Sequence, residues 1–167
     1  MAPTIKVLVV DDSALARGLI SRRLASDPGI EVVGTASDGV EAFERVKALR
    51  PDVVTLDVQM PVMDGLAALQ KIMSSVPTPV VMLSSLTGDD SDTTIRALEL
   101  GAIDFFLKPS SVSPGGLDGG AKDLVSSAAR KRTTGAEQKW ATGSAIGAEG
   151  WPVSAMRLGF GRRAAGR

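Results

Sequence analysis

The residues best suited to chemistry in this 167-residue sequence each stand directly after a short apolar run. They are an acid pair, a single acid, a hydroxyl and an amine: Asp11-Asp12, Asp57, Ser84 and Lys108. Three carboxylates that lie close together cannot all stay ionised without a counter-charge, and Mg²⁺, which prefers oxygen ligands, would supply it. A carboxylate beside Mg²⁺ and a lysine can attack a phosphoryl group and become an aspartyl phosphate. The five residues therefore predict a site that accepts a phosphoryl group.

Each of these residues has a predicted role. The acid pair and Asp57 would give carboxylate oxygens to Mg²⁺, with the backbone carbonyl of Gln59 as a further ligand. Asp57 would be the nucleophile, Lys108 would balance the charge that develops on the phosphoryl oxygens, and Ser84 would hydrogen-bond to the added phosphate. A lone aspartate after a strand is most often a turn residue or a helix cap. The whole set, placed at successive strand ends, favours the functional interpretation.

The composition excludes several other chemistries. The chain has no histidine and no cysteine, which rules out a Ser-His-Asp triad, a Cys-His pair, His-ligated zinc and disulfides within it. No apolar run approaches the roughly 20 residues that span a bilayer, and the N-terminus turns acidic after one short apolar run, unlike a signal peptide. We therefore expect a cytoplasmic protein with no membrane insertion.

Five short apolar runs recur at fairly even spacing: residues 5–10, 30–35, 53–56, 80–83 and 103–107. Most are β-branched and continuous, which is typical of parallel strands that are covered on both faces. Helical patterns lie between them, so the sequence predicts an α/β domain with a doubly wound, five-stranded parallel sheet. The expected strand order is the flavodoxin-like 2-1-3-4-5, with helices on both faces, and ligands bind outside the carboxyl ends of such strands.

Caps and apolar stripes predict the helices. Ser13 would cap a helix that runs to about residue 25, and Ser37 or Asp38 would start the next. A third would follow Gly65 over residues 66–76, and a fourth would start within 89–92 and end at Gly101. The predicted apolar stripe of the first helix comprises Leu15, Leu19, Ile20 and Leu24. The predicted apolar face of the second comprises Val40, Phe43, Val46 and Leu49.

The chain changes character after Pro109. We predict a domain over residues 1–132, made of a core at 4–109, a Gly/Ser/Pro linker at 110–120 and a fifth, basic helix at 121–132. Residues 133–167 are rich in Gly, Ala, Ser and Arg and show no sustained period, so a flexible or disordered tail is expected. The charge divides at the same place. Residues 1–116 hold 15 acidic and 10 basic residues, whereas 117–167 hold 4 and 9.

Four stretches, "VLVVDDSALAR", "DVVTLDVQMPVMDG", "PVVMLSS" and "GAIDFFLKP", resemble the receiver domain of two-component response regulators. A finer resemblance, in "SSLT" followed by "ALELGAIDF", is to the receiver of the chemotaxis protein-glutamate methylesterase. The resemblance implies that Asp57 is the phosphoacceptor, that Asp11 and Asp12 bind Mg²⁺, and that Ser84 and Lys108 are the family's hydroxyl and lysine. It also implies that Phe105 is an aromatic switch residue.

The resemblance implies a chemotaxis histidine kinase as the phosphoryl donor, and a methylesterase domain or chemoreceptors as further partners. The methylesterase has a second domain with a Ser-Thr-Gly-Gly nucleophile motif and a catalytic histidine, and the sequence has neither. Ser144 lies among glycines but lacks the strand–turn–helix context of a nucleophile. We therefore expect Mg²⁺-dependent self-phosphorylation and dephosphorylation, and no ester hydrolysis, from this stretch of chain.

Three alternatives stay open. The chain could be a single-domain regulator that diffuses to its target, although its basic tail is unusual for one. It could be a DNA-binding regulator cut short, but no helix-turn-helix pattern is visible and nucleic-acid binding is not expected. It could also be a Mg²⁺ phosphohydrolase with an aspartate nucleophile. Those enzymes need a second acid two residues after the nucleophile, where this chain has Gln59.

Overall fold

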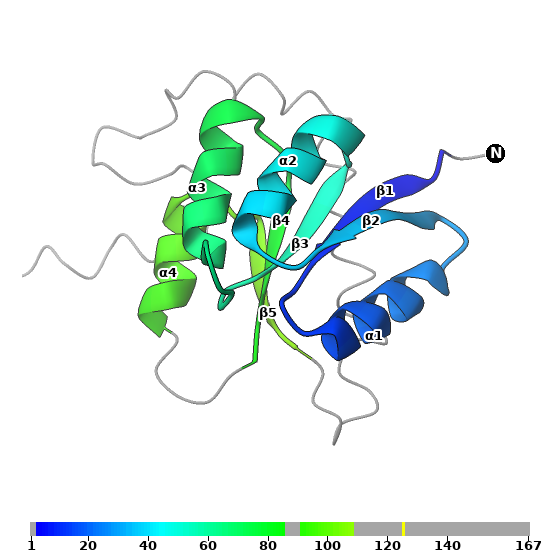
Figure 1. Cartoon of the computed structure of the whole chain (residues 1–167), viewed down its shortest axis with the longest axis horizontal. Helices are drawn as coiled ribbons and strands as arrows, with labels where there is room; N and C mark the ends of the chain where they lie inside the picture. The colour runs from blue at the N-terminus through cyan, green and yellow to red at the C-terminus, as the bar shows by residue number, and fades with distance from the viewer. Residues whose placement is uncertain (1–2, 86–90, 109–124, 126–167) are drawn as a thin grey trace, which may run out of the picture.

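A computed structural model of the chain describes residues 3–85, 91–108 and Val125. Five strands and four helices alternate along it (Figure 1). The strands are β1 Ile5–Val10, β2 Ile30–Ala36, β3 Val53–Asp57, β4 Val80–Ser84 and β5 Asp104–Leu107. The helices are α1 Ala14–Ala25, α2 Gly39–Leu49, α3 Gly65–Ser75 and α4 Ser91–Glu99.

The strands form one parallel sheet in the order β2-β1-β3-β4-β5, which confirms the predicted fold. Because the strands are continuous apolar runs, apolar side chains project from both faces of the sheet. Leu8, Leu56 and Met82 pack in one apolar cluster with α2, α3 and α4, whereas Val9 and Leu83 pack in another with α1. The sheet is thus the middle of three layers, with α2, α3 and α4 on one face and α1 on the other (Figure 1).

Side-chain caps start three of the helices. The Ser13 hydroxyl accepts a hydrogen bond from the Ala16 amide at 3.3 Å, as predicted for the first helix. The Asp38 carboxylate accepts from the amides of Val40 and Glu41, so Asp38, rather than Ser37, is the cap of α2. These caps satisfy amides that have no partner inside the helix.

Two predicted apolar stripes are partly wrong. In α1, Ile20 and Leu24 are buried, but Leu15 is 70 % exposed and Leu19 is 37 % exposed. Leu15 lies outside the buried face of α1 because it is five residues, and therefore about 140° of helix rotation, away from Ile20. The partly buried Arg17, three residues before Ile20, occupies that face instead.

The predicted apolar face of α2 is also only partly buried. Phe43 and Val46 of α2 are buried, whereas Val40 is 41 % exposed and Leu49 is 37 % exposed. The buried face of α2 includes the small residues Gly39 and Ala42, which hydrophobicity alone does not single out.

The predicted linker 110–120 and tail 133–167 lie outside the described residues. Of the predicted fifth helix, 121–132, the structure describes Val125 alone. That residue is helical and fully buried in the apolar cluster on the α1 side of the sheet. In the described part of the chain, no helix has the length and apolar character that crossing a membrane requires.

Candidate functional site

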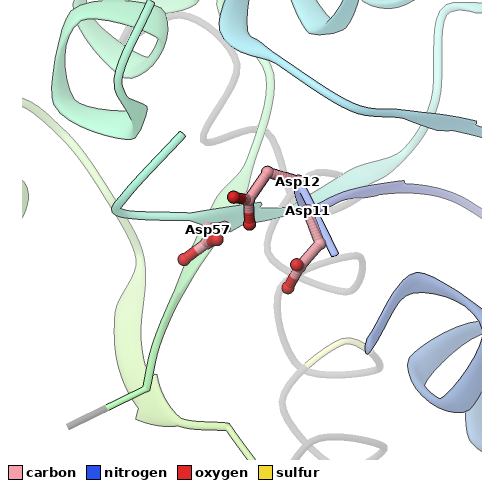
Figure 2. Close-up of side chains that lie close together, drawn as sticks. All are labelled: Asp11, Asp12 and Asp57. Carbon is pink, nitrogen blue, oxygen red and sulfur yellow. The ribbon is translucent and has the colours of Figure 1, made fainter. Parts of the chain in front are cut away.

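Three carboxylates meet at the carboxyl-end edge of the sheet (Figure 2). Asp11 and Asp12 follow the last residue of β1, and Asp57 is the last residue of the adjacent strand β3. One carboxylate oxygen from each lies within 4.8 Å of the other two. Asp11 and Asp57 are buried, whereas Asp12 is exposed, so the cluster is open to solvent on the Asp12 side.

Lys108 places an ammonium between the two buried carboxylates. Its Nζ lies 2.6 Å from Asp11 Oδ2 and 2.8 Å from Asp57 Oδ2. The lysine directly follows β5, and its backbone amide donates to the Ser84 carbonyl at the end of β4. The sheet therefore brings the amine at position 108 to two acids that lie 97 and 51 residues earlier in the chain.

Backbone amides hold the other oxygens of the two buried carboxylates. Asp11 Oδ1 accepts from the Ser13 amide at 2.9 Å, and Asp57 Oδ1 accepts from the Gln59 amide at 3.3 Å. Each carboxylate thus has one oxygen directed to its own turn and one to Lys108. This arrangement fixes the orientation of both side chains.

The site changes the proton affinity of its groups. Burial raises the pKa of the Asp57 carboxyl above its ordinary value, and the charge of Asp11 adds to this effect, although Lys108 and the Gln59 amide oppose it. Burial by itself would lower the pKa of Lys108, but its hydrogen bonds and charge interactions with Asp11 and Asp57 raise it overall. Lys108 is therefore charged at neutral pH and forms an ion pair with each of the two acids.

The charges and donor atoms of the site fit a hard divalent cation. Three ionised carboxylates and one ammonium leave two negative charges uncompensated. The buried Asp11 Oδ2 lies 2.6 Å from Lys108 Nζ and has no second partner among the described residues. An acidic oxygen cluster of this kind suits Mg²⁺, which takes oxygen ligands and keeps some of its water.

The turn after β3 is shaped by glycine. A Cβ on Gly65 would overlap the backbone carbonyl of Asp57, and the Gly65 amide donates to the Val58 carbonyl at 2.8 Å. The start of α3 is thus packed directly on the backbone of the acid that ends β3. Only glycine allows this approach.

The tip of the same turn is strained. Val62 has a φ of +67°, and the Met63 amide donates to the Pro61 carbonyl at 2.7 Å, which closes a γ-turn around Val62. A β-branched residue with positive φ is a rare and unfavourable conformation. The turn is held from outside, because the Gly39 amide at the start of α2 donates to the Met63 carbonyl.

The other predicted residues lie around the acid cluster. Ser84 ends β4, one residue beyond Leu83, which pairs with Asp57 across the sheet. Phe105 lies in β5, partly buried against the cluster formed by α2, α3 and α4. Gln59 has an exposed side chain and an amide turned toward Asp57. The predicted roles of its carbonyl and of the Ser84 hydroxyl stay predictions.

The sequence reasoning missed one residue that touches the site. Arg17 Nη1 donates to the backbone carbonyls of Asp11 at 2.8 Å and of Asp12 at 3.3 Å. The signal that would have revealed it is its spacing of three residues from the buried Ile20, which places it on the inner face of α1.

Comparison with known proteins agrees with this geometry. Residues 7–114 match the response regulator receiver domain. The chain belongs to this family. Receiver domains bind Mg²⁺ at an acidic pocket, and the aspartate cluster of this chain fits that property.

The curated relatives point to one subgroup. The chain is 54 % identical over 122 residues to protein-glutamate methylesterase/protein-glutamine glutaminase 1 of Xanthomonas campestris pv. campestris, covering 73 % of this chain and 34 % of that protein. The namesake from Xanthomonas euvesicatoria pv. vesicatoria is 45 % identical over 159 residues, which cover 93 % of this chain and 44 % of that protein. The chain therefore spans less than half the length of these relatives and corresponds to a receiver of the chemotaxis methylesterase type.

Solved structures agree as well. The response regulator domain of Thermotoga maritima CheB has a TM-score of 0.70 and 42 % sequence identity, covering 76 % of this chain and 97 % of that one. CheY6 of R. sphaeroides, crystallised with the P1 domain of CheA3, has a TM-score of 0.63 and 32 % identity, covering 75 % and 99 %.

Proposed function

We propose that Asp57 accepts a phosphoryl group from the phosphohistidine of a chemotaxis histidine kinase. An Asp57 carboxylate oxygen attacks the phosphorus, the phosphorus–nitrogen bond breaks, and the imidazole leaves with the electron pair. The single observation that supports this step best is the position of Lys108 Nζ, 2.8 Å from Asp57 and 2.6 Å from Asp11. An ammonium there is already in place to balance the negative charge of the transferred group.

Asp11, Asp12 and Asp57 would hold Mg²⁺, with the Gln59 carbonyl as a further ligand. Bound there, Mg²⁺ supplies positive charge to the phosphoryl oxygens during transfer. The chain's own contribution is orientation: the Ser13 and Gln59 amides hold one oxygen of each buried carboxylate. Ser84, at the neighbouring strand end, would donate its hydroxyl hydrogen to the transferred phosphate.

The proposed output is a change of surface around β5. A phosphate on Asp57 would draw Lys108 and Ser84 into new charge-assisted hydrogen bonds, and the switch residue Phe105 would repack from its partly buried position. The relatives are named as methylesterases, so we propose a methylesterase domain as the regulated partner, with chemoreceptors as its target and the cytoplasm as its location. Residues 1–167 contain no histidine and therefore hold no Ser–His pair for ester hydrolysis.

Phosphorylation of the full chain by acetyl phosphate with Mg²⁺, followed by intact-mass spectrometry, tests the assignment. Wild type should gain one phosphoryl group, and Asp57→Asn should gain none because an amide is a poor nucleophile. Asp64→Asn is the matched control, since Asp64 lies in the same turn but caps α3 through the Ala67 amide. A label that survives Asp57→Asn, or one that forms equally well in a metal chelator, would refute the proposed site or its metal.

A further inference from the structure

Arg17 ties the first turn of α1 to the end of β1. One guanidinium nitrogen, Nη1, donates to two successive carbonyls, those of Asp11 at 2.8 Å and Asp12 at 3.3 Å. The backbone amide of Arg17 donates in turn to the Ser13 carbonyl at 2.9 Å. Side chain and backbone of one residue thus close a loop around the three-residue turn that carries the acid pair.

The two carbonyls belong to the peptide units that set the direction of the acid pair. The Asp11 carboxylate is further held by the Ser13 amide at 2.9 Å, and that amide belongs to the same turn. If the peptide planes rotate, both carboxylates move relative to Asp57. A guanidinium nitrogen that bridges consecutive carbonyls opposes this rotation, because its two N–H bonds are fixed in the guanidinium plane.

We propose that Arg17 is a positioning residue that fixes the Asp11–Asp12 turn and thereby raises the affinity of the acid cluster for Mg²⁺. The inference rests on the proposed function, since it assumes a cation at these acids. Arg17 touches neither the cation nor the phosphoryl group in this scheme. It acts through the backbone of the two residues that do.

The charge of Arg17 would act in the opposite direction. A fixed positive charge near a cation site repels the cation and weakens its binding. Neutralising Arg17 should therefore tighten Mg²⁺ binding if charge is its main effect, and loosen it if positioning is. The sign of the change distinguishes the two roles.

The test is a Mg²⁺ titration of the full chain, in which the amide NMR chemical shifts of Asp12 and Ser13 report binding. Arg17→Gln should raise the Mg²⁺ dissociation constant about tenfold, the effect of losing one hydrogen bond from a charged donor. Arg17→Lys keeps the charge but has a shorter side chain without a planar donor group. Its dissociation constant should therefore lie between those of wild type and Arg17→Gln. Arg22→Gln is the matched control, because Arg22 lies on the same helix and donates to the Gly18 carbonyl, away from the site.

Amide hydrogen exchange measured without metal tests the positioning role of Arg17 independently of phosphorylation. In Arg17→Gln the Ser13 amide should exchange its hydrogen several-fold faster than in wild type, while the Val40 amide, held by the Asp38 cap of α2, keeps its rate. Unchanged or tighter Mg²⁺ binding by Arg17→Gln, with wild-type binding intact, would overturn the positioning role alone. Absence of any Mg²⁺ response in wild type would overturn the proposed metal site together with it.

Discussion

The two turns that present acids to the site are built in different ways. The turn after β1 has three residues and is held by side chains: the Asp11 carboxylate, the Ser13 cap and the Arg17 guanidinium. The turn after β3 has seven residues and is held mainly by backbone contacts, with Gly65 packed on the Asp57 carbonyl and Val62 at positive φ. The first turn carries the two acids proposed as Mg²⁺ ligands, and the second directly follows the proposed nucleophile.

The difference predicts different responses to substitution. In the first turn, a substitution removes one or two hydrogen bonds, each of which contributes about 1 kcal/mol. In the second turn, an added methyl group collides with the backbone, so small changes are costly. Lys108 joins the two turns through Asp11 and Asp57, and its loss should affect both.

The largest effect is expected from Lys108→Met. It leaves two buried carboxylates without their ammonium, and breaking such a pair typically costs 3–5 kcal/mol, so we expect about 3 kcal/mol at pH 7 in urea unfolding. The loss should shrink in acid, as Asp57, whose pKa burial raises, becomes protonated. Because the pKa of Lys108 is raised, its contribution is complete below the ordinary lysine pKa and is lost only above the raised one.

Lys71→Met is the control for this prediction. Lys71 is exposed and lies over the Phe43 ring at 4.5 Å, so its loss should cost less than about 1 kcal/mol. Equal losses for the two lysines would show that the buried ion pairs do not join the two turns.

Glycine substitutions should come next. Gly65→Ala should lower the free energy of unfolding by about 2–3 kcal/mol, because the new Cβ meets the Asp57 carbonyl and the backbone must shift. Gly18→Ala, inside α1, has only the Arg22 side chain within 4 Å and should stabilise by about 0.5–1 kcal/mol. Thermal unfolding of both variants measures the contrast, and a stable Gly65→Ala would refute the close backbone contact.

Asp57→Asn should show a smaller, pH-dependent gain. Burial raises the pKa of Asp57 in the folded state, so ionisation of this group costs stability as the pH rises above its ordinary value. Without Mg²⁺, the variant should be more stable than wild type at pH 7, and the difference should decrease toward pH 4. Denaturation at both pH values measures it, with Asp64→Asn as the control for the substitution itself; a gain that is independent of pH contradicts the cause.

The smallest effect is expected at the tip of the second turn. Val62 is 85 % exposed, so its side chain contributes little packing, whereas its positive φ costs about 1–2 kcal/mol. Val62→Gly relieves that strain but makes the unfolded chain more flexible, so a net gain of about 0.5–1 kcal/mol is expected in thermal unfolding. A loss of stability would mean that valine is not strained there.

The sequence was sufficient to predict the sheet and the place of the acid cluster. Continuous apolar runs identify buried parallel strands, and a polar residue at the end of such a run must emerge at the sheet edge. This pattern predicts that Asp11, Asp57 and Lys108 lie together at one edge of the sheet. Their distances and the pairing of one lysine with two acids depend on strand register, which the sequence does not specify.

Other features depend on tertiary contacts. Leu15 is apolar but exposed, and Arg17 is charged but turned inward, because the way α1 sits on the sheet overrides the pattern of apolar residues. Val62 contradicts its own backbone preference, and the contacts made by Gly39 and Gly65 hold it there. Local propensity gives no sign of either arrangement.

The position of Lys108 after the last strand has a consequence for how the domain assembles. During synthesis the chain makes both buried acids long before it makes the lysine that neutralises them. A partly formed sheet of β1 to β4 would therefore bring Asp11 and Asp57 together without their ammonium, and like charges would oppose its closure. Docking of the short edge strand β5 brings Lys108 between the two acids and removes that repulsion, so the edge strand with the fewest residues stabilises the centre of the sheet.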